Sequence, residues 1–181
     1  SLGLPAFTIV GLPDAAVQEA KERVRAAIRN SSCLFPTTRI TVNLAPADLR
    51  KEGPAYDLPI ALGIMMASEQ VKCTEAEGLF LGELSLDGSV RHTTGMLPMV
   101  CLARDRHIKM VYVPAEDAAE AALIEELDVI PVKNLAQLAK HLRGEERIEP
   151  FKNDGTLDAA EVVYPVDMAF VKGQEHVKRA L

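Results

Sequence analysis

Residues 51–63 read KEGPAYDLPIALG, a tight turn followed at once by an unbroken apolar run. Gly53 and Pro54 are the turn-forming residues. Residues 57–68 predict a helix that is apolar on all sides, and such a helix lies buried at the centre of a fold. Asp57 is placed to cap its N-terminus. The residue at the head of the turn is Ala55, whose methyl group has neither a proton to lose nor a lone pair to attack with.

The residues before this turn predict a strand, a helix and a second strand. A short strand opens the stretch PAFTIVGLPD (5–14), and apolar residues then recur at helical spacing from 14 to 30. Glu19 precedes Arg23 by four residues in that helix, an orientation that makes an ion pair worth about 0.2–0.5 kcal/mol. Residues 38–45, TRITVNLA, alternate between apolar and polar, which predicts a half-buried strand.

The residues after the apolar helix predict a hairpin and then alternating strands and helices. The hairpin spans 79–95, with Asp87 and Gly88 as its tight turn. A helix at 96–106, strands at 110–113 and 127–132, and helices at about 116–126 and 134–142 follow. Strand–helix alternation favours parallel pairing there, whereas the hairpin requires antiparallel pairing. The sequence therefore predicts an α/β (mixed α+β) fold, a mixed sheet covered by helices, that ends near Gly144.

The chain divides into three parts by composition. Residues 1–143 form the predicted domain, and residues 144–166 are charged, aperiodic and interrupted by Gly and Pro, which is typical of a linker. Residues 167–181 become helical again but are too few to form a domain. Because the chain opens in a strand and closes within a helical pattern, we expect it to be a piece of a longer protein.

The composition excludes several classes of protein. Of 181 residues, 48% are hydrophobic and 25% charged, which are values of a globular chain. A net charge of −6 gives the whole chain no field that attracts nucleic acid or an anionic membrane. The longest apolar run, 58–67, is too short to span a bilayer. Three widely spaced cysteines fit a reducing cytosol, so we expect a cytoplasmic protein without membrane contact.

Metal-binding residues are scattered along the sequence. The histidines are His92, His107, His141 and His176. No two of them are close in sequence, and none has a cysteine or carboxylate at ligand spacing. We therefore expect no metal site in this chain.

Acid–base and nucleophilic residues also form no clear constellation. Asp48, Glu52 and Asp57 could do acid–base work if they were buried, but a solvated loop with a helix cap is the favoured interpretation. Glu83 lies inside a predicted strand, where a structural role is favoured over a catalytic one. None of the serines sits in a strained turn beside a lysine or histidine that could activate it.

Phosphate recognition has one candidate. No GxxxxGK[ST] motif occurs, but the sequence offers candidates for a basic patch: Arg23, Arg25, Arg29, Arg39, Arg50 and Lys51. Arg25 and Arg29 stand four residues apart on one helix, and with Arg50 and Lys51 they are the candidate contacts to a nucleic-acid backbone. An ordinary solvated helix face is the favoured alternative. The negative net charge of the chain also indicates that these residues contribute only modestly to DNA binding.

Three stretches together resemble one protein family. LPAFTIVGLPDAAVQEAKERVRAAI, RITVNLAPADLRKEGPAYDLPIALG and LFLGELSLDGSV are similar to the N-terminal domain of the Mg-chelatase-like AAA+ family, also called YifB or ComM. The resemblance covers residues 3–142. FVKGQEHVKRAL (170–181) is similar to the opening of an AAA+ module, which implies that Val171, Gly173 and Gln174 lie near the adenine of ATP.

The family resemblance also implies a fold and an explanation for Ala55. The N-terminal domain of the family resembles the proteolytic domain of Lon, a ribosomal protein S5 domain 2-like fold, so residues 1–143 would be a Lon-protease-like (ChlI-type) domain. In Lon the matching turn reads Gly-Pro-Ser with a catalytic serine, and a catalytic lysine follows the hairpin. Here Ala55 takes the place of the serine, and Leu97 in TGML (94–97) that of the lysine. Loss of the nucleophile alone costs about 10⁶-fold in kcat, so this piece is predicted to be inactive.

By resemblance, the domain would act in ring assembly and substrate guidance for an AAA+ motor. The full-length protein would be a hexameric ATPase that binds ATP and Mg²⁺ outside this piece and moves DNA branches in natural transformation. Two alternatives stay open. One is a diverged Lon-type serine peptidase with another nucleophile; the other is a subunit that inserts Mg²⁺ into a porphyrin.

Overall fold

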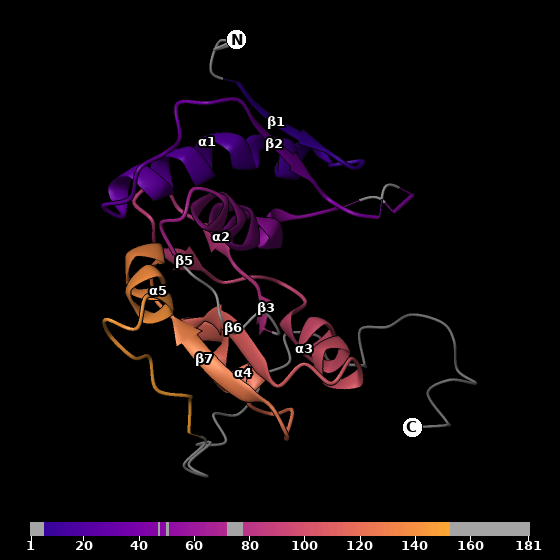
Figure 1. Cartoon of the computed structure of the whole chain (residues 1–181). Coiled ribbons are helices and arrows are strands. Elements are labelled where there is room, and N and C mark those ends of the chain that lie inside the picture. The colour runs from indigo at the N-terminus through magenta and orange to yellow at the C-terminus, as the bar shows by residue number, and fades with distance from the viewer. Residues whose placement is uncertain (1–5, 47, 50, 72–77, 153–181) are drawn as a thin grey trace, which may run out of the picture.

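The computed structural model describes residues 6–46, 48–49, 51–71 and 78–152 (Figure 1). The helices are α1 Ala15–Asn30, α2 Asp57–Ala67, α3 Met96–Asp105, α4 Ala118–Ala121 and α5 Leu135–Leu142, with 3₁₀ turns η1 Pro54–Tyr56 and η2 Ala115–Asp117. The strands are β1 Phe7–Val10, β2 Ile40–Asn43, β3 Gly78–Phe80, β4 Glu83–Leu84, β5 Val90–Arg91, β6 Met110–Pro114 and β7 Asp128–Val132. The predicted mixed α/β class is confirmed.

The strands of the described residues pair into three small sheets instead of one continuous mixed sheet. β1 and β2 are parallel, β3, β6 and β7 form a parallel sheet with β6 in the middle, and β4 and β5 form an antiparallel hairpin. The predicted hairpin over 79–95 is therefore too long. Its turn is confirmed, since the Gly88 N–H donates to the Ser85 carbonyl at 2.9 Å, but residues 79–80 pair with β6.

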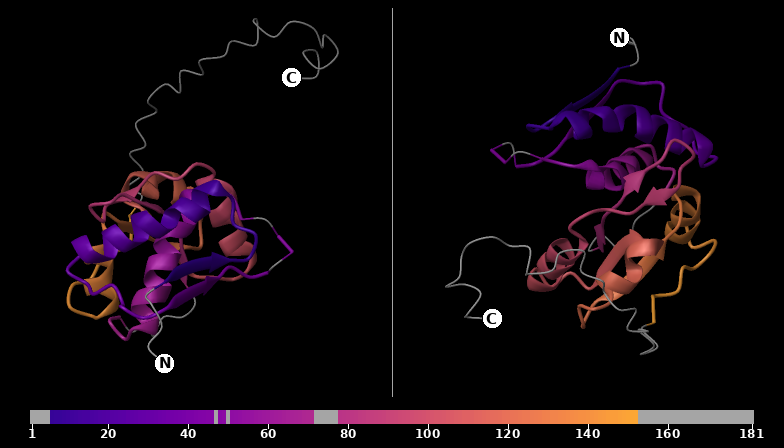
Figure 2. Two further views of the ribbon diagram at one scale, coloured as in Figure 1. Left: turned by 90° about the horizontal axis from the view of Figure 1, so that it is seen from above. Right: turned by 180° about the vertical axis from the view of Figure 1, so that it is seen from behind.

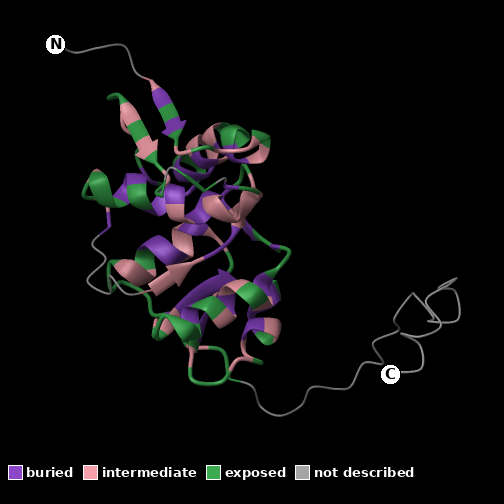
Figure 3. Ribbon diagram, turned by 90° about the vertical axis from the view of Figure 1, so that its right-hand side faces the viewer, coloured by how far each residue is buried: buried purple, intermediate pink, exposed green. Residues whose placement is uncertain are grey.

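The two parallel sheets lie on opposite sides of the molecule, with α2 and the hairpin between them (Figures 1 and 2). α1 lies beside β1 and β2, while α3, α4 and α5 surround the three-stranded sheet. One apolar core runs from α1 and α2 to Tyr112 and Ile130, and a second forms beneath α3 and α4. Buried residues lie on helices and strands throughout the molecule (Figure 3). α2 is thus the element that joins the two sides.

Helix α1 forms as its sequence predicts. The Asp14 carboxylate accepts the Val17 N–H at 2.8 Å and caps the first turn. The residues predicted to form its apolar face are all fully buried: Val17, Ala20, Val24, Ala27 and Ile28. At its other end, the N–H of Ser31 donates back to the Ile28 carbonyl at 3.2 Å.

Helix α2 is central, as predicted, but it is not buried all round. Leu58, Ala61 and Met65 are fully buried, whereas Gly63 and Met66 are exposed. The predicted cap is wrong: the residue at the N-cap position is Tyr56, and it makes no side-chain capping bond. Asp57 has a different role because its carboxylate points into the protein.

Asp57 forms a buried ion pair with Arg23 of α1. The Arg23 guanidinium donates to the two carboxylate oxygens through Nε at 2.6 Å and Nη2 at 3.1 Å. The Leu84 N–H donates to the same carboxylate at 3.1 Å, so one side chain joins α1, α2 and β4. Burial raises the pKa of Asp57, and the bonds from Arg23 and Leu84 oppose that rise. The predicted Glu19–Arg23 pair also forms, at 3.8 Å, but it is secondary.

A second side-chain link connects the segment after β5 to η2. The imidazole Nδ1 of His92 contacts the carboxylate of Asp117, and the Thr93 N–H donates to the other carboxylate oxygen at 3.0 Å. The His92 N–H donates to the Glu116 carboxylate at 2.7 Å. The hydrogen bond to Asp117, followed by the charge of that residue, raises the pKa of His92 above its ordinary value.

Two further boundaries differ from or extend the sequence prediction. The helix predicted over 116–126 is too long: α4 ends at Ala121, and residues 122–126 form turns, with Glu126 at a φ of 74°. Beyond α5, the Ile148 side chain is buried and its N–H donates to His141 Nδ1 at 2.9 Å. The Phe151 N–H donates to the Val129 carbonyl at 2.7 Å, so the first residues of the predicted linker pack on the domain. The domain boundaries at 143 and 166 stay predictions.

Replacing Asp57 by Ala should destabilise the fold by about 3–5 kcal/mol, because it leaves the Arg23 guanidinium and the Leu84 N–H without a partner. Urea unfolding followed by circular dichroism measures the change. The matched control is Asp128→Ala at an exposed position of β7, expected to change stability by at most about 0.5 kcal/mol. Equal losses in the two variants would show that the Arg23–Asp57 pair does not hold α1, α2 and β4 together.

The His92–Asp117 link should make stability depend on pH. The pKa of His92 in the folded state is raised above the unfolded value of about 6.5. The link therefore stabilises the fold fully below that pH, and this stabilisation is lost as the pH rises through the folded-state pKa. His92→Gln should therefore lower the free energy of unfolding more at about pH 5.5 than at about pH 9. His107→Gln controls for the loss of an exposed histidine. A His92→Gln loss that is the same at both pH values contradicts this account.

Candidate functional site

The turn at Gly53–Ala55 is held by backbone hydrogen bonds on both of its sides. Gly53 has a φ of 82°, a conformation that favours glycine, and its N–H donates to the Asp14 carboxylate at 3.1 Å. Pro54 begins the 3₁₀ turn, where no backbone N–H is needed. The Ala55 carbonyl accepts the Gly82 N–H at 3.3 Å. The side chain of residue 55 takes no part in these bonds.

The positions matched to the Lon dyad carry no group that could do chemistry. Ala55 is half-buried in η1, and Leu97 is half-buried in the first turn of α3. The nearest carboxylate in sequence, Asp57, is fully engaged by Arg23 and Leu84. None of these three side chains is available as a nucleophile or a base.

The other candidate acid, base and nucleophile residues form no catalytic arrangement among the described residues. Asp48 and Glu52 are exposed on the loop before it, whereas Glu83 is half-buried in β4 opposite Arg91. Among the described residues, no serine hydroxyl is hydrogen-bonded to a lysine or histidine. In the same part of the chain, no group of three His, Cys, Asp or Glu residues is arranged to hold a metal ion.

Arg25 and Arg29 both line a hollow of about 260 Å³. Phe35, Pro36, Thr37, Thr38 and Ala6 form the rest of its lining. The Arg25 guanidinium lies over the Phe35 ring, 5.4 Å from its centroid. The sequence prediction missed the residues from 35 to 38, although a signal was present: no Asp or Glu occurs between Arg23 and Asp48.

Lys51 is separated from this arginine pair. It is 4% exposed, and its ammonium group donates to the carbonyls of Pro46 and, at 2.5 Å, Leu49. Its backbone also bonds to the Leu12 carbonyl and the Asp14 N–H. Lys51 therefore organises its own loop and presents no ammonium group to a phosphate backbone.

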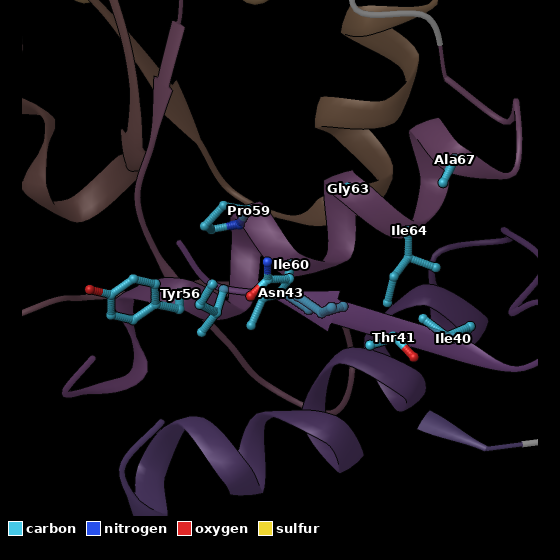
Figure 4. A pocket seen from close by; sticks show the side chains of 11 residues that line it. Ile40, Thr41, Asn43, Tyr56, Pro59, Ile60, Gly63, Ile64 and Ala67 are labelled. Carbon is cyan, nitrogen blue, oxygen red and sulfur yellow. The ribbon is translucent and has the colours of Figure 1, made fainter. Parts of the chain in front are cut away.

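An apolar groove of about 370 Å³ lies between β2 and α2 (Figure 4). Ile40, Thr41 and Asn43 line it from the strand, and Ile60 and Ile64 from the helix, with the Tyr56 ring at one end. Gly63 leaves the middle open, since a Cβ built there meets no atom within 4 Å. The groove is lined mainly by apolar side chains and contains no carboxylate and no cationic side chain.

Several predicted site residues lie outside the described residues. They are Arg50 and the three residues matched to the adenine side of an AAA+ module, Val171, Gly173 and Gln174. Their roles stay predictions. In the part of the chain that the structure describes, no helix has the length and apolar character needed to cross a membrane.

Comparison with known proteins places these features in a family. Residues 1–117 match the family described as subunit ChlI of Mg-chelatase. Competence protein ComM of Haemophilus influenzae is 37% identical over 193 residues, which cover 100% of this chain and 36% of that protein. YifB of Salmonella typhimurium is 42% identical over 183 residues, covering 100% of this chain and 35% of that protein.

An uncharacterized protein of Mycobacterium tuberculosis is 40% identical over 182 residues, covering 99% of this chain and 35% of its own length. The chain thus spans about a third of the length of the curated relatives it matches, 35–36% in these three. Taken with the family match over residues 1–117, these similarities show that the chain belongs to the Mg-chelatase-like ComM/YifB family.

Proposed function

We propose that this chain is a non-catalytic, Lon-like N-terminal domain that assembles an AAA+ ring and guides its substrate. The observation that carries the proposal is the turn at Gly53–Ala55, which keeps its backbone hydrogen bonds while Ala55 and Leu97 occupy the two positions matched to the Lon dyad. A site without a nucleophile or base can position a substrate but cannot cleave it. The domain would therefore act through its surfaces, by binding other subunits and the substrate.

The full-length protein would be a cytoplasmic, hexameric ATPase that migrates DNA branches during natural transformation or recombination. One relative carries the name competence protein, which supports a role in DNA uptake or recombination. ATP and Mg²⁺ fit membership of a Mg-chelatase ATPase family. They would bind to the part of the protein that follows this domain, where Val171, Gly173 and Gln174 would lie on the adenine side.

Removing residues 1–143 from the full-length protein tests the assembly role. Sedimentation of the intact and truncated proteins with ATP and branched DNA should show that truncation weakens the ring, lowers DNA affinity, or does both. A truncated protein that forms the same ring and binds branched DNA with the same affinity would rule the proposal out. ATP hydrolysis without DNA is the control that the remaining motor is folded.

A fluorophosphonate probe tests the absence of a serine nucleophile. We expect no labelled serine in this chain and no cleavage of casein, because no described serine hydroxyl is bonded to a lysine or histidine. An active serine peptidase treated in parallel shows that the probe and substrate work. Labelling that disappears when one serine is replaced by alanine would support the diverged peptidase instead.

A further inference from the structure

The hollow beside Arg25 and Arg29 combines two guanidinium groups with threonine hydroxyl groups, which are features of a phosphate site. Both arginines project from one face of α1, and the other wall is the segment from 35 to 38. We infer that this hollow binds a phosphodiester of single-stranded DNA. The choice of DNA as the strand rests on the proposed function, whereas the phosphate chemistry rests on the residues themselves.

The hollow has a guanidinium group that is available to a ligand. Arg29 is exposed, and no described carboxylate lies within ion-pair distance of it. Arg23, on the same helix, is engaged by the buried Asp57 and is not available. The one acidic neighbour is Glu22, whose carboxylate lies 3.7 Å from Arg25 and is largely exposed. An exposed pair of this kind holds its partner weakly, so a phosphate can replace Glu22.

The side chains of the hollow are organised before a ligand arrives. Arg25 stacks on Phe35, and Phe35 in turn packs against Phe7 with ring centroids 5.7 Å apart. This stack fixes the direction of a side chain that would otherwise lose rotamer entropy on binding. A planar guanidinium held in this way can offer two parallel N–H donors to phosphate oxygens.

Hydroxyl groups are also available in this hollow. Thr37 and Thr38 line the hollow, are exposed, and have no hydrogen-bond partner among the described residues. Hydroxyl donors beside paired arginines are a frequent way of fixing a phosphate in register. The local charge agrees, because residues 23–47 contain four arginines and no Asp or Glu in a chain whose net charge is −6.

The shape of the hollow favours a single strand. A recess of about 260 Å³ accepts one phosphate from a flexible strand, whereas the phosphates of a duplex lie on a rigid outer surface. Phe35 is covered by Arg25 and Phe7, so it does not serve as a stacking platform for a base. Binding should therefore depend on phosphate contacts, vary little with base sequence, and weaken steeply with salt.

Fluorescence anisotropy with a labelled oligothymidine of about 20 nucleotides, added to the full chain, tests this site. The Arg25→Gln/Arg29→Gln variant should bind at least about tenfold more weakly at low salt. The slope of log affinity against log salt should become shallower by about 1.4, since each single-strand phosphate contact contributes about 0.7. Thr37→Val/Thr38→Val should weaken binding with the slope unchanged.

The matched control is Arg104→Gln/Arg147→Gln, which removes the same two charges from exposed positions elsewhere. It should retain near-normal binding, and circular dichroism of all variants checks the fold. Equal losses in the two arginine double variants would overturn the site, because net charge alone would then explain binding. Tighter binding of a duplex, or displacement of the strand by inorganic phosphate at similar concentration, would overturn the single-strand assignment.

Failure of the phosphate site and failure of the proposed function give different experimental results. Unchanged oligonucleotide binding by Arg25→Gln/Arg29→Gln would remove the phosphate site and leave the assembly role as it stands. Unchanged assembly and branched-DNA binding after truncation of the full-length protein would remove the proposed function, whatever the isolated chain does with an oligonucleotide.

Discussion

The fold around the Gly53–Ala55 turn depends on one desolvated carboxylate, that of Asp57. Its oxygens receive Arg23 from α1 and the Leu84 N–H from β4, while its own backbone begins α2. A buried ion pair adds little net stability, because the cost of desolvating both charges offsets their attraction. Its contribution is geometric: any other arrangement of α1, α2 and β4 leaves a charge buried without a partner. The position of the turn follows from that arrangement.

The backbone of the turn explains how a methyl group can stand at its tip. Gly53 is held through its N–H by Asp14, a residue that also caps α1, and Ala55 is held through its carbonyl by Gly82. Gly82 itself has no room for a side chain, since a Cβ there would lie 2.6 Å from Val90. None of these interactions uses the side chain at position 55. The side chain at position 55 can therefore differ without removing any of these contacts.

What the sequence could predict depended on how local the deciding interaction is. The buried face of α1, the Asp87–Gly88 turn and the bounds of α5 follow from spacing within a few residues. The pairing of Leu79 with Val111 in a parallel sheet joins residues far apart in the chain, so the same apolar run also fitted a longer hairpin. Asp57 was predicted as a cap because a carboxylate at a helix start usually is one. Only the approach of Arg23 decides otherwise.

The arginines of α1 show how one helix can serve both the core and a surface. At 100° per residue, Arg23 and Arg25 point to opposite sides of the helix, whereas Arg25 and Arg29 share a side. Arg23 turns inward to Asp57, and the other two border the hollow beside Phe35. An acid-free stretch therefore supplies charge to two separate environments. The net charge of the whole chain does not reveal that Arg23 and the pair Arg25 and Arg29 serve different environments. Arg25 and Arg29 are neighbours on one face of the helix, although they are four residues apart in the sequence.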